Sequence, residues 1–159
     1  MNGAHLHLLL NHFPLIGFVF SFLLLALGLF RSNESYVRTG FLIILLSGMF
    51  AIPTYLAGEP AEKIIEKLPG FSEKLVEAHE EAAELAIWFI GITTLAAGAA
   101  LWFANKKSVT SKMILRPILV LNFISLVLIG RTSNLGGKIS HPEVRDTNSQ
   151  VSTSQDRDK

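Results

Sequence analysis

Four long apolar runs constrain this chain more than any other feature of its sequence. They cover about residues 6–30, 36–58, 82–104 and 113–131. A helix needs roughly 20 mainly apolar residues to cross the hydrocarbon core of a bilayer, and these runs are of that length. Backbone polar groups in lipid must be satisfied within the segment, so such runs fold as helices. The sequence therefore predicts an all-α integral membrane protein, a bundle of four helices in a lipid bilayer.

Composition agrees with this reading and excludes several classes of function. Half of the 159 residues are hydrophobic and the formal net charge is only +1, so overall charge gives no support for binding nucleic acid. The chain contains no cysteine. Disulfides, thiolate metal sites, iron–sulfur clusters and covalently attached c-type haem are thereby excluded. Histidine, carboxylate and backbone groups remain as ligands for a cofactor.

The segment between the second and third spans has a different character. Residues 59–79 are charged, with apolar residues at helical spacing, which predicts an amphipathic segment at the membrane interface. Pro69-Gly70 should break this segment. Ser72 then offers an N-cap with Glu73 in the first turn, so the third helix is expected to begin well outside the bilayer.

The end of the chain is strongly polar. Gly136-Gly137 predicts a turn soon after the fourth span, and residues 144–159 predict a disordered polar tail because they are poor in apolar side chains. The four-span bundle, with its amphipathic segment, is thus expected to occupy residues 1–143.

Basic residues predict the orientation in the membrane. Two loops that must share one side carry six of them: Arg31, Arg38, Lys106, Lys107, Lys112 and Arg116. The positive-inside rule places these loops in the cytoplasm, so the N- and C-termini and residues 59–79 lie on the outer side. We therefore expect a multi-pass protein of the bacterial inner membrane, with both termini in the periplasm.

All five histidines fall on that outer side. They are His5, His7, His12, His79 and His141. Ionisable side chains at the mouth of a membrane helix are costly and usually functional. Counting back from the cytoplasmic helix ends at about 1.5 Å per residue places His7 and His79 at nearly the same height, with His12 a turn or two deeper. Imidazoles from separate spans are therefore expected to converge on one cofactor.

Haem b is the first candidate for that cofactor. Its iron can be held between two histidines on different helices of a bundle, without any cysteine. The candidate ligands are His7, His12, His79 and His141, and Arg131 and Asn134 could lie near the propionates. Two histidine ligands leave the iron without an open position. This predicts an electron carrier or redox subunit, rather than a stand-alone enzyme, working between the quinone pool or a partner subunit and a periplasmic acceptor.

Two other readings use the same residues. A copper, zinc or iron ion could be bound by His7, His12, His79 and His141, with Glu80 or Glu84 as a carboxylate ligand, in a metal-handling protein or metalloenzyme. Alternatively, the histidines are ordinary interfacial residues of a cofactor-free structural subunit. In each case a homo-oligomer or a larger membrane complex is the expected setting.

Four stretches of the chain resemble a known family. HLHLLLNHFPLIG, TYLAGEPAE, the helix of His79 and RTSNLGGKISHPE are similar to the predicted membrane proteins called domain of unknown function 2231. That family typically has four spans, a histidine five residues before a His-Phe-Pro motif, a histidine opening the third span and a Gly-Gly pair after the fourth. These features match His7, His12, His79 and Gly136-Gly137. The resemblance covers roughly residues 5–143 and implies an electron-transfer or haem-binding membrane subunit, sometimes attached to a Rieske-type domain.

Overall fold

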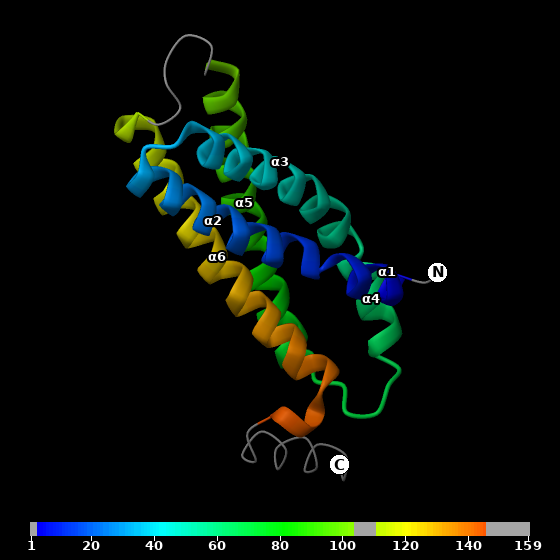
Figure 1. Ribbon diagram of the computed structural model, residues 1–159. Helices are drawn as coiled ribbons and strands as arrows, with labels where there is room; N and C mark the ends of the chain where they lie inside the picture. Colours follow the sequence, from blue (N-terminus) through cyan, green and yellow to red (C-terminus); the bar gives the residue numbers. More distant parts are fainter. Residues whose placement is uncertain (1–2, 104–110, 146–159) are drawn as a thin grey trace.

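The computed structural model describes residues 3–103 and 111–145, and every regular element within them is helical. Figure 1 shows the helices in chain order. Their bounds are α1 Gly3–Leu10, α2 His12–Arg31, α3 Glu34–Leu56, α4 Gly58–Ile65, α5 Glu73–Phe103, α6 Lys112–Ser140 and the short 3-10 helix η1 Pro142–Val144.

Four helical stretches are long and apolar enough to cross a membrane. They are Gly3–Arg31, which joins α1 to α2, Glu34–Ile65, which joins α3 to α4, and the single helices Glu73–Phe103 and Lys112–Ser140. The prediction of an all-helical protein with four spans is thus confirmed for the described residues.

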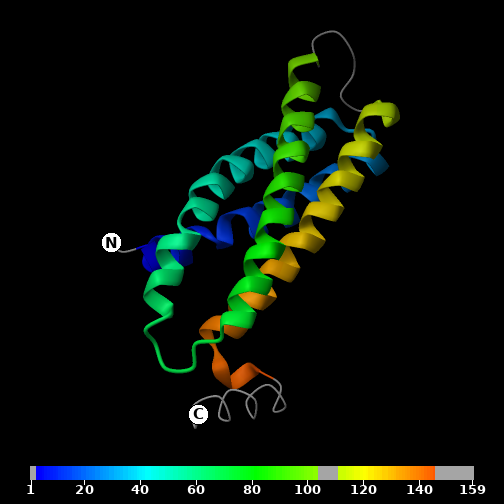
Figure 2. The same ribbon diagram turned by 180° about the vertical axis from the view of Figure 1, so that it is seen from behind.

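The four long helices pack around one core. α2 packs on α3 and α5 on α6, and the two pairs join through contacts of α3 with α5 and of α2 with α6. α1 and α4 pack on each other beside one end of this bundle (Figures 1 and 2). The largest fully buried apolar side chains are Phe18, Leu25, Val37, Phe41, Ile44 and Leu115. Large apolar side chains also cover the outside, among them Trp88, Leu95 and Trp102, as expected of a surface in lipid.

Polar side chains link the helices inside the bundle. The Asn122 amide nitrogen on α6 donates to the Ser21 hydroxyl on α2 at 2.7 Å, and the Thr93 and Ser125 hydroxyls join α5 to α6 at 3.0 Å. All four residues are fully buried. Membrane helices lack a hydrophobic driving force between them, so such hydrogen bonds help to specify which helices pair.

The first span has a junction just before His12. Pro14 favours a kink just after this histidine; in the structure α1 ends at Leu10 and α2 starts at His12, and Asn11 between them keeps helical dihedral angles (φ −60°, ψ −24°). Pro14 explains the position. It has no N–H to give to the carbonyl four residues earlier, at Leu10, and proline is tolerated in the first turn of a helix.

The end of α6 corrects one prediction. Gly136 and Gly137 form no turn, because α6 continues through them to Ser140, packed along α5. The predicted break at Pro69-Gly70 is confirmed, since α4 ends at Ile65, α5 starts at Glu73 and Gly70 has a φ of +83°.

The first two residues of the predicted polar tail are placed against the bundle. Val144 belongs to η1, and the Arg145 guanidinium donates to the carbonyls of Lys138 at 2.7 Å and Gly70 at 2.8 Å. These bonds fasten the chain after α6 to the loop that precedes α5. The rest of the predicted tail, 146–159, lies outside the described residues, as do Lys106 and Lys107.

Candidate functional site

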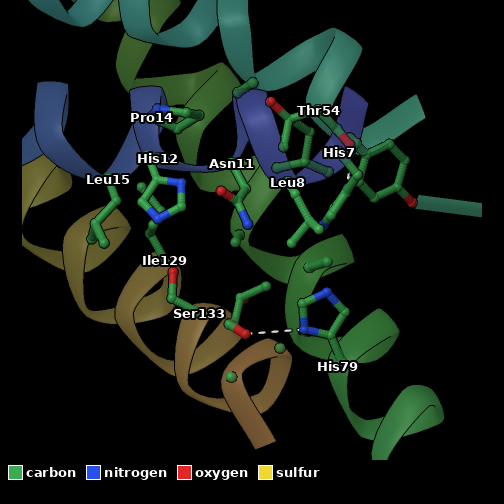
Figure 3. A pocket seen from close by; sticks show the side chains of 18 of the residues that line it. His7, Leu8, Asn11, His12, Pro14, Leu15, Thr54, His79, Ile129 and Ser133 are labelled. Carbon is green, nitrogen blue, oxygen red and sulfur yellow. Dashed lines mark hydrogen bonds between the residues drawn. The ribbon is translucent and has the colours of Figure 1, made fainter. Parts of the chain in front are cut away.

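His7 and His79 meet at the end of the bundle that carries α1 and α4. His7 lies on α1 and His79 on α5, and their ring centroids are 6.3 Å apart with the ring planes at 76°. Figure 3 shows the two rings pointing toward each other. Their nearly equal heights, estimated from helix rise alone, therefore correspond to a real juxtaposition.

Each ring is held by a backbone carbonyl. The Nδ1 atom of His7 lies 3.0 Å from the Thr54 carbonyl oxygen of α3, and Nδ1 of His79 lies 3.0 Å from the Thr132 carbonyl oxygen of α6. A carbonyl can only accept, so Nδ1 donates in both rings, and in the neutral form of each ring Nε2 carries the lone pair. Histidines that bind metals are oriented in the same way, by donating their other N–H to a carbonyl or carboxylate.

The local structure makes these contacts possible. Thr54 lies in the last turn of α3, where carbonyls have no partner within the helix. Gly136 of α6 faces the other ring, and a Cβ at this position would lie 3.1 Å from the His79 Cε1 atom. The absence of a side chain at Gly136 therefore leaves the space that the His79 ring occupies.

Two cavities meet at the histidine pair. The bundle cavity, of about 330 Å³, extends between α2, α3, α5 and α6 past Asn11 and Ile129. The α4 cavity, of about 660 Å³, extends toward α4 past Glu62 and Ile65. Residues that line both are His7, Leu8, Tyr55, His79, Ala83, Gly136 and Ser140. Both volumes fall within the ~300–1,000 Å³ typical of ligand and cofactor sites.

The α4 cavity is strongly acidic. Its lining includes Glu59, Glu62, Glu77, Glu80, Glu81 and Glu84. No Lys or Arg of the described residues lines either cavity. Lys63 pairs with Glu59 at 2.6 Å, but carboxyl groups still outnumber basic groups around this cavity, which favours cations over anionic groups.

Two other histidines line the bundle cavity but do not belong to the histidine pair. His12, at the start of α2, lines the bundle cavity with a ring that is exposed at its surface (Figure 3). His141 also lines this cavity, but its Nδ1 lies 2.9 Å from the Glu143 carboxylate. The Glu143 backbone N–H and then His141 lower the pKa of the Glu143 carboxyl below its ordinary value. His5 is exposed and lines neither cavity.

The other expected site residues are placed differently. Arg131 and Asn134 are exposed on α6 and line neither cavity. Glu80 and Glu84 line the α4 cavity together with the histidine pair. Among residues 3–103 and 111–145, however, no group of three or more histidine or carboxylate side chains is placed to share a metal ion. The structure thus presents a pair of imidazoles rather than a cluster.

Sequence reasoning missed the two carbonyls that hold the rings. Thr54 and Thr132 contribute backbone atoms, and a backbone atom leaves no signal in residue identity. Asn11 was a detectable polar residue within an apolar run, and its buried side-chain oxygen has no hydrogen-bond partner in the described structure. Asn11 lines the bundle cavity, and in the sequence it lies between His7 and His12.

Comparison with known proteins gives one match. Residues 3–144 match the model of a family described as predicted membrane protein, domain of unknown function 2231. The match covers nearly the whole described chain and all four candidate spans. No curated protein and no solved structure matched the chain.

Proposed function

We propose a haem-binding, electron-transferring function for this chain, which belongs to the family of predicted membrane proteins called domain of unknown function 2231. His7 and His79 would hold the iron of haem b. One observation carries this proposal: two imidazoles from different spans face each other where two cavities join, each with Nδ1 bonded to a backbone carbonyl.

The number of ligands favours haem. A bare zinc site in a protein uses three or four protein ligands. Haem supplies four nitrogens of its own and needs only two axial ligands in an electron carrier. The described residues bring two imidazoles together and no third histidine or carboxylate to complete a bare metal site.

The spacing of the rings also fits. Two imidazoles on opposite sides of one metal ion, each with its nitrogen ~2.0–2.1 Å away, have ring centroids roughly 6 Å apart. The His7 and His79 centroids are separated by 6.3 Å. The bundle cavity and the α4 cavity extend from this axis in different directions, which offers space for a flat group between the rings.

The surrounding residues have distinct tasks in this site. The Thr54 and Thr132 carbonyls orient the imidazoles and raise their basicity as ligands. Apolar residues such as Leu15, Ile90 and Ile129 keep water from the bundle cavity. Bound haem would supply one-electron chemistry, and the two histidines leave its iron no open position, which favours electron transfer.

The site is proposed to face the periplasm of a bacterial inner membrane. The end of α2 and the starts of α3 and α6 lie at the bundle end opposite α1 and α4 (Figure 1). These helix ends carry Arg31, Arg38, Lys112 and Arg116. The positive-inside rule assigns that end to the cytoplasm. A quinone and a periplasmic redox protein are then the proposed partners, in a homo-oligomer or larger membrane complex.

An optical spectrum of the purified protein tests this function. Protein made in cells supplied with haem should show a Soret band and about one haem per chain by pyridine haemochrome assay. His7→Ala and His79→Ala should each abolish or shift this spectrum, whereas His5→Ala should leave it unchanged. Colourless wild-type protein, or equal spectra from all variants, would refute haem ligation by this pair.

A metal ion is the second candidate, and the acidic lining favours it. Six glutamates and no Lys or Arg of the described chain line the α4 cavity, which would attract a metal cation and repel haem propionates. A colourless protein that carries stoichiometric copper, zinc or iron by elemental analysis, lost in His79→Ala, would establish this function instead.

A further inference from the structure

A second polar site lies in the bundle cavity, away from the glutamates. Asn11, His12 and Ser133 line it together, and Figure 3 shows them at the part of the cavity between α2 and α6. The Asn11 side-chain oxygen is buried and has no hydrogen-bond partner within the described structure. Buried polar atoms are nearly always paired. Thr94 Oγ1 and Asn122 Oδ1 are unpaired as well, but neither residue lines either cavity, whereas the Asn11 acceptor lies where a donor on a ligand can reach it.

The junction of α1 and α2 carries this acceptor. Asn11 stands between α1 and α2, and its backbone N–H donates to the His7 carbonyl at 2.9 Å. Its side chain is thereby placed on the cavity wall beside His12, which opens α2. Imidazole can donate or accept, and the Ser133 hydroxyl can do both. A ligand with hydroxyl groups can therefore form hydrogen bonds with more than one of Asn11, His12 and Ser133.

The rest of this wall selects an apolar ligand. Pro14, Leu15, Ile87, Ile90 and Ile129 line the same cavity. A ligand must therefore combine an apolar body with a polar donor, as pockets for small molecules commonly require. A sugar or a charged metabolite would lose its hydration here without enough partners.

The ligand would arrive through the bilayer. The neighbour of His12, Phe13, is 50% exposed and stacks on Phe50 of α3 at 4.9 Å, so this side of the site borders the lipid-facing surface of a membrane span. His12 itself is exposed as well as lining the cavity. The site is thus reachable by a molecule dissolved in lipid.

We propose that Asn11, His12 and Ser133 form a binding site for a lipid-soluble hydroquinone, whose hydroxyl donates to the Asn11 side-chain oxygen. The reduced form carries two O–H donors and an apolar ring, whereas the oxidised quinone carries only acceptors. The unpaired acceptor therefore selects the reduced form. The role of this ligand as an electron donor rests on the proposed function, but its binding does not require a cofactor.

Binding of two redox forms of one probe tests the proposal. Full-length protein in lipid nanodiscs is titrated with tetramethylhydroquinone, kept reduced with dithionite, and separately with tetramethylbenzoquinone, using equilibrium dialysis. Wild type should bind the hydroquinone about tenfold more tightly, the ratio expected for one buried acceptor satisfied in one complex only. Asn11→Leu should abolish this preference, and Ser133→Ala should weaken hydroquinone binding several-fold.

Two further variants control the measurement. Asn134→Leu changes the same residue type on the exposed side of α6, outside both cavities, and should keep the wild-type preference. Ile129→Trp fills the bundle cavity and should block both probes, which tests the site even if Asn11→Leu fails to fold.

The outcomes separate this inference from the haem proposal. Equal affinity of wild type for both probes, or a preference that survives in Asn11→Leu, would overturn the hydroquinone site. The Soret band is measured on the same samples. Protein without haem that shows the Asn11-dependent preference would support the hydroquinone site and refute haem binding. Protein with haem that lacks this preference would refute the hydroquinone site and support haem binding.

Discussion

The ring of His7 on α1 lies 6.3 Å from the ring of His79 on α5, and each donates from Nδ1 to a carbonyl of another helix. Four helices therefore meet at this pair, because Thr54 belongs to α3 and Thr132 to α6. The packing of these helices occupies Nδ1 of each ring with a carbonyl, and this leaves Nε2 as the nitrogen available to a ligand.

Gly136 is expected to be sensitive to a single added methyl group. In Gly136→Ala the new Cβ would lie 3.1 Å from His79 Cε1, so the ring must shift and cofactor affinity should fall. Gly137→Ala is the matched control, since nothing lies within 4 Å of a Cβ there. The control should gain roughly 0.5–1 kcal/mol of stability, as alanine does over glycine in a helix. Spectral titration of both variants gives their affinity for the proposed cofactor, and thermal unfolding gives their stability. Equal cofactor affinity of Gly136→Ala and Gly137→Ala would contradict the close contact between Gly136 and the His79 ring.

Ser21→Ala should weaken the pairing of α2 with α6. The change leaves the fully buried Asn122 amide without its acceptor, which lies 2.7 Å away in the wild type. We expect a loss of about 0.5–2 kcal/mol in unfolding free energy, in the range measured for hydrogen bonds between membrane helices and for unpaired buried groups. Unfolding in mixed detergent followed by circular dichroism gives the value. Ser35→Ala, at an exposed position, should change the unfolding free energy by much less. An unchanged unfolding free energy in Ser21→Ala would show that the bond between Ser21 and Asn122 does not stabilise the bundle.

Arg145 is expected to hold the loop between α4 and α5 in place. Its guanidinium bonds the carbonyls of Gly70 and Lys138, so Arg145→Ala should free residues 66–72. A local loss of about 1 kcal/mol would speed amide exchange and tryptic cleavage at Lys67 roughly fivefold. Arg131→Ala, on the exposed side of α6, should have no such effect. Unchanged exchange in Arg145→Ala would mean that other contacts order this loop.

The orientation can be tested with single cysteines, because the chain has none of its own. Ser72→Cys precedes α5 at the end that carries the histidine pair, and Ser35→Cys lies at the opposite end, in the first turn of α3. A membrane-impermeant maleimide added to intact spheroplasts should label the first variant and not the second. The reverse pattern would place the histidine pair in the cytoplasm and remove the periplasmic part of the proposed function.

Two features of the site were predictable from sequence because they depend on helix geometry alone. The spans follow from apolar length, and the matching heights of His7 and His79 follow from a constant rise per residue. The angular positions were not predictable. On one straight helix His7 and His12, five residues apart, would point about 140° away from each other. Spacing along the chain does not say which of the two rings meets the ring of His79.

Apolar run length by itself determined that this protein has four helices able to cross a membrane, because lipid offers the backbone no partner outside the helix. Tertiary structure alone decided that His7 pairs with His79 and that Arg131 stays outside the cavities. The physical reason is that ring orientation depends on carbonyls and on the space above Gly136, which come from helices far apart in the chain.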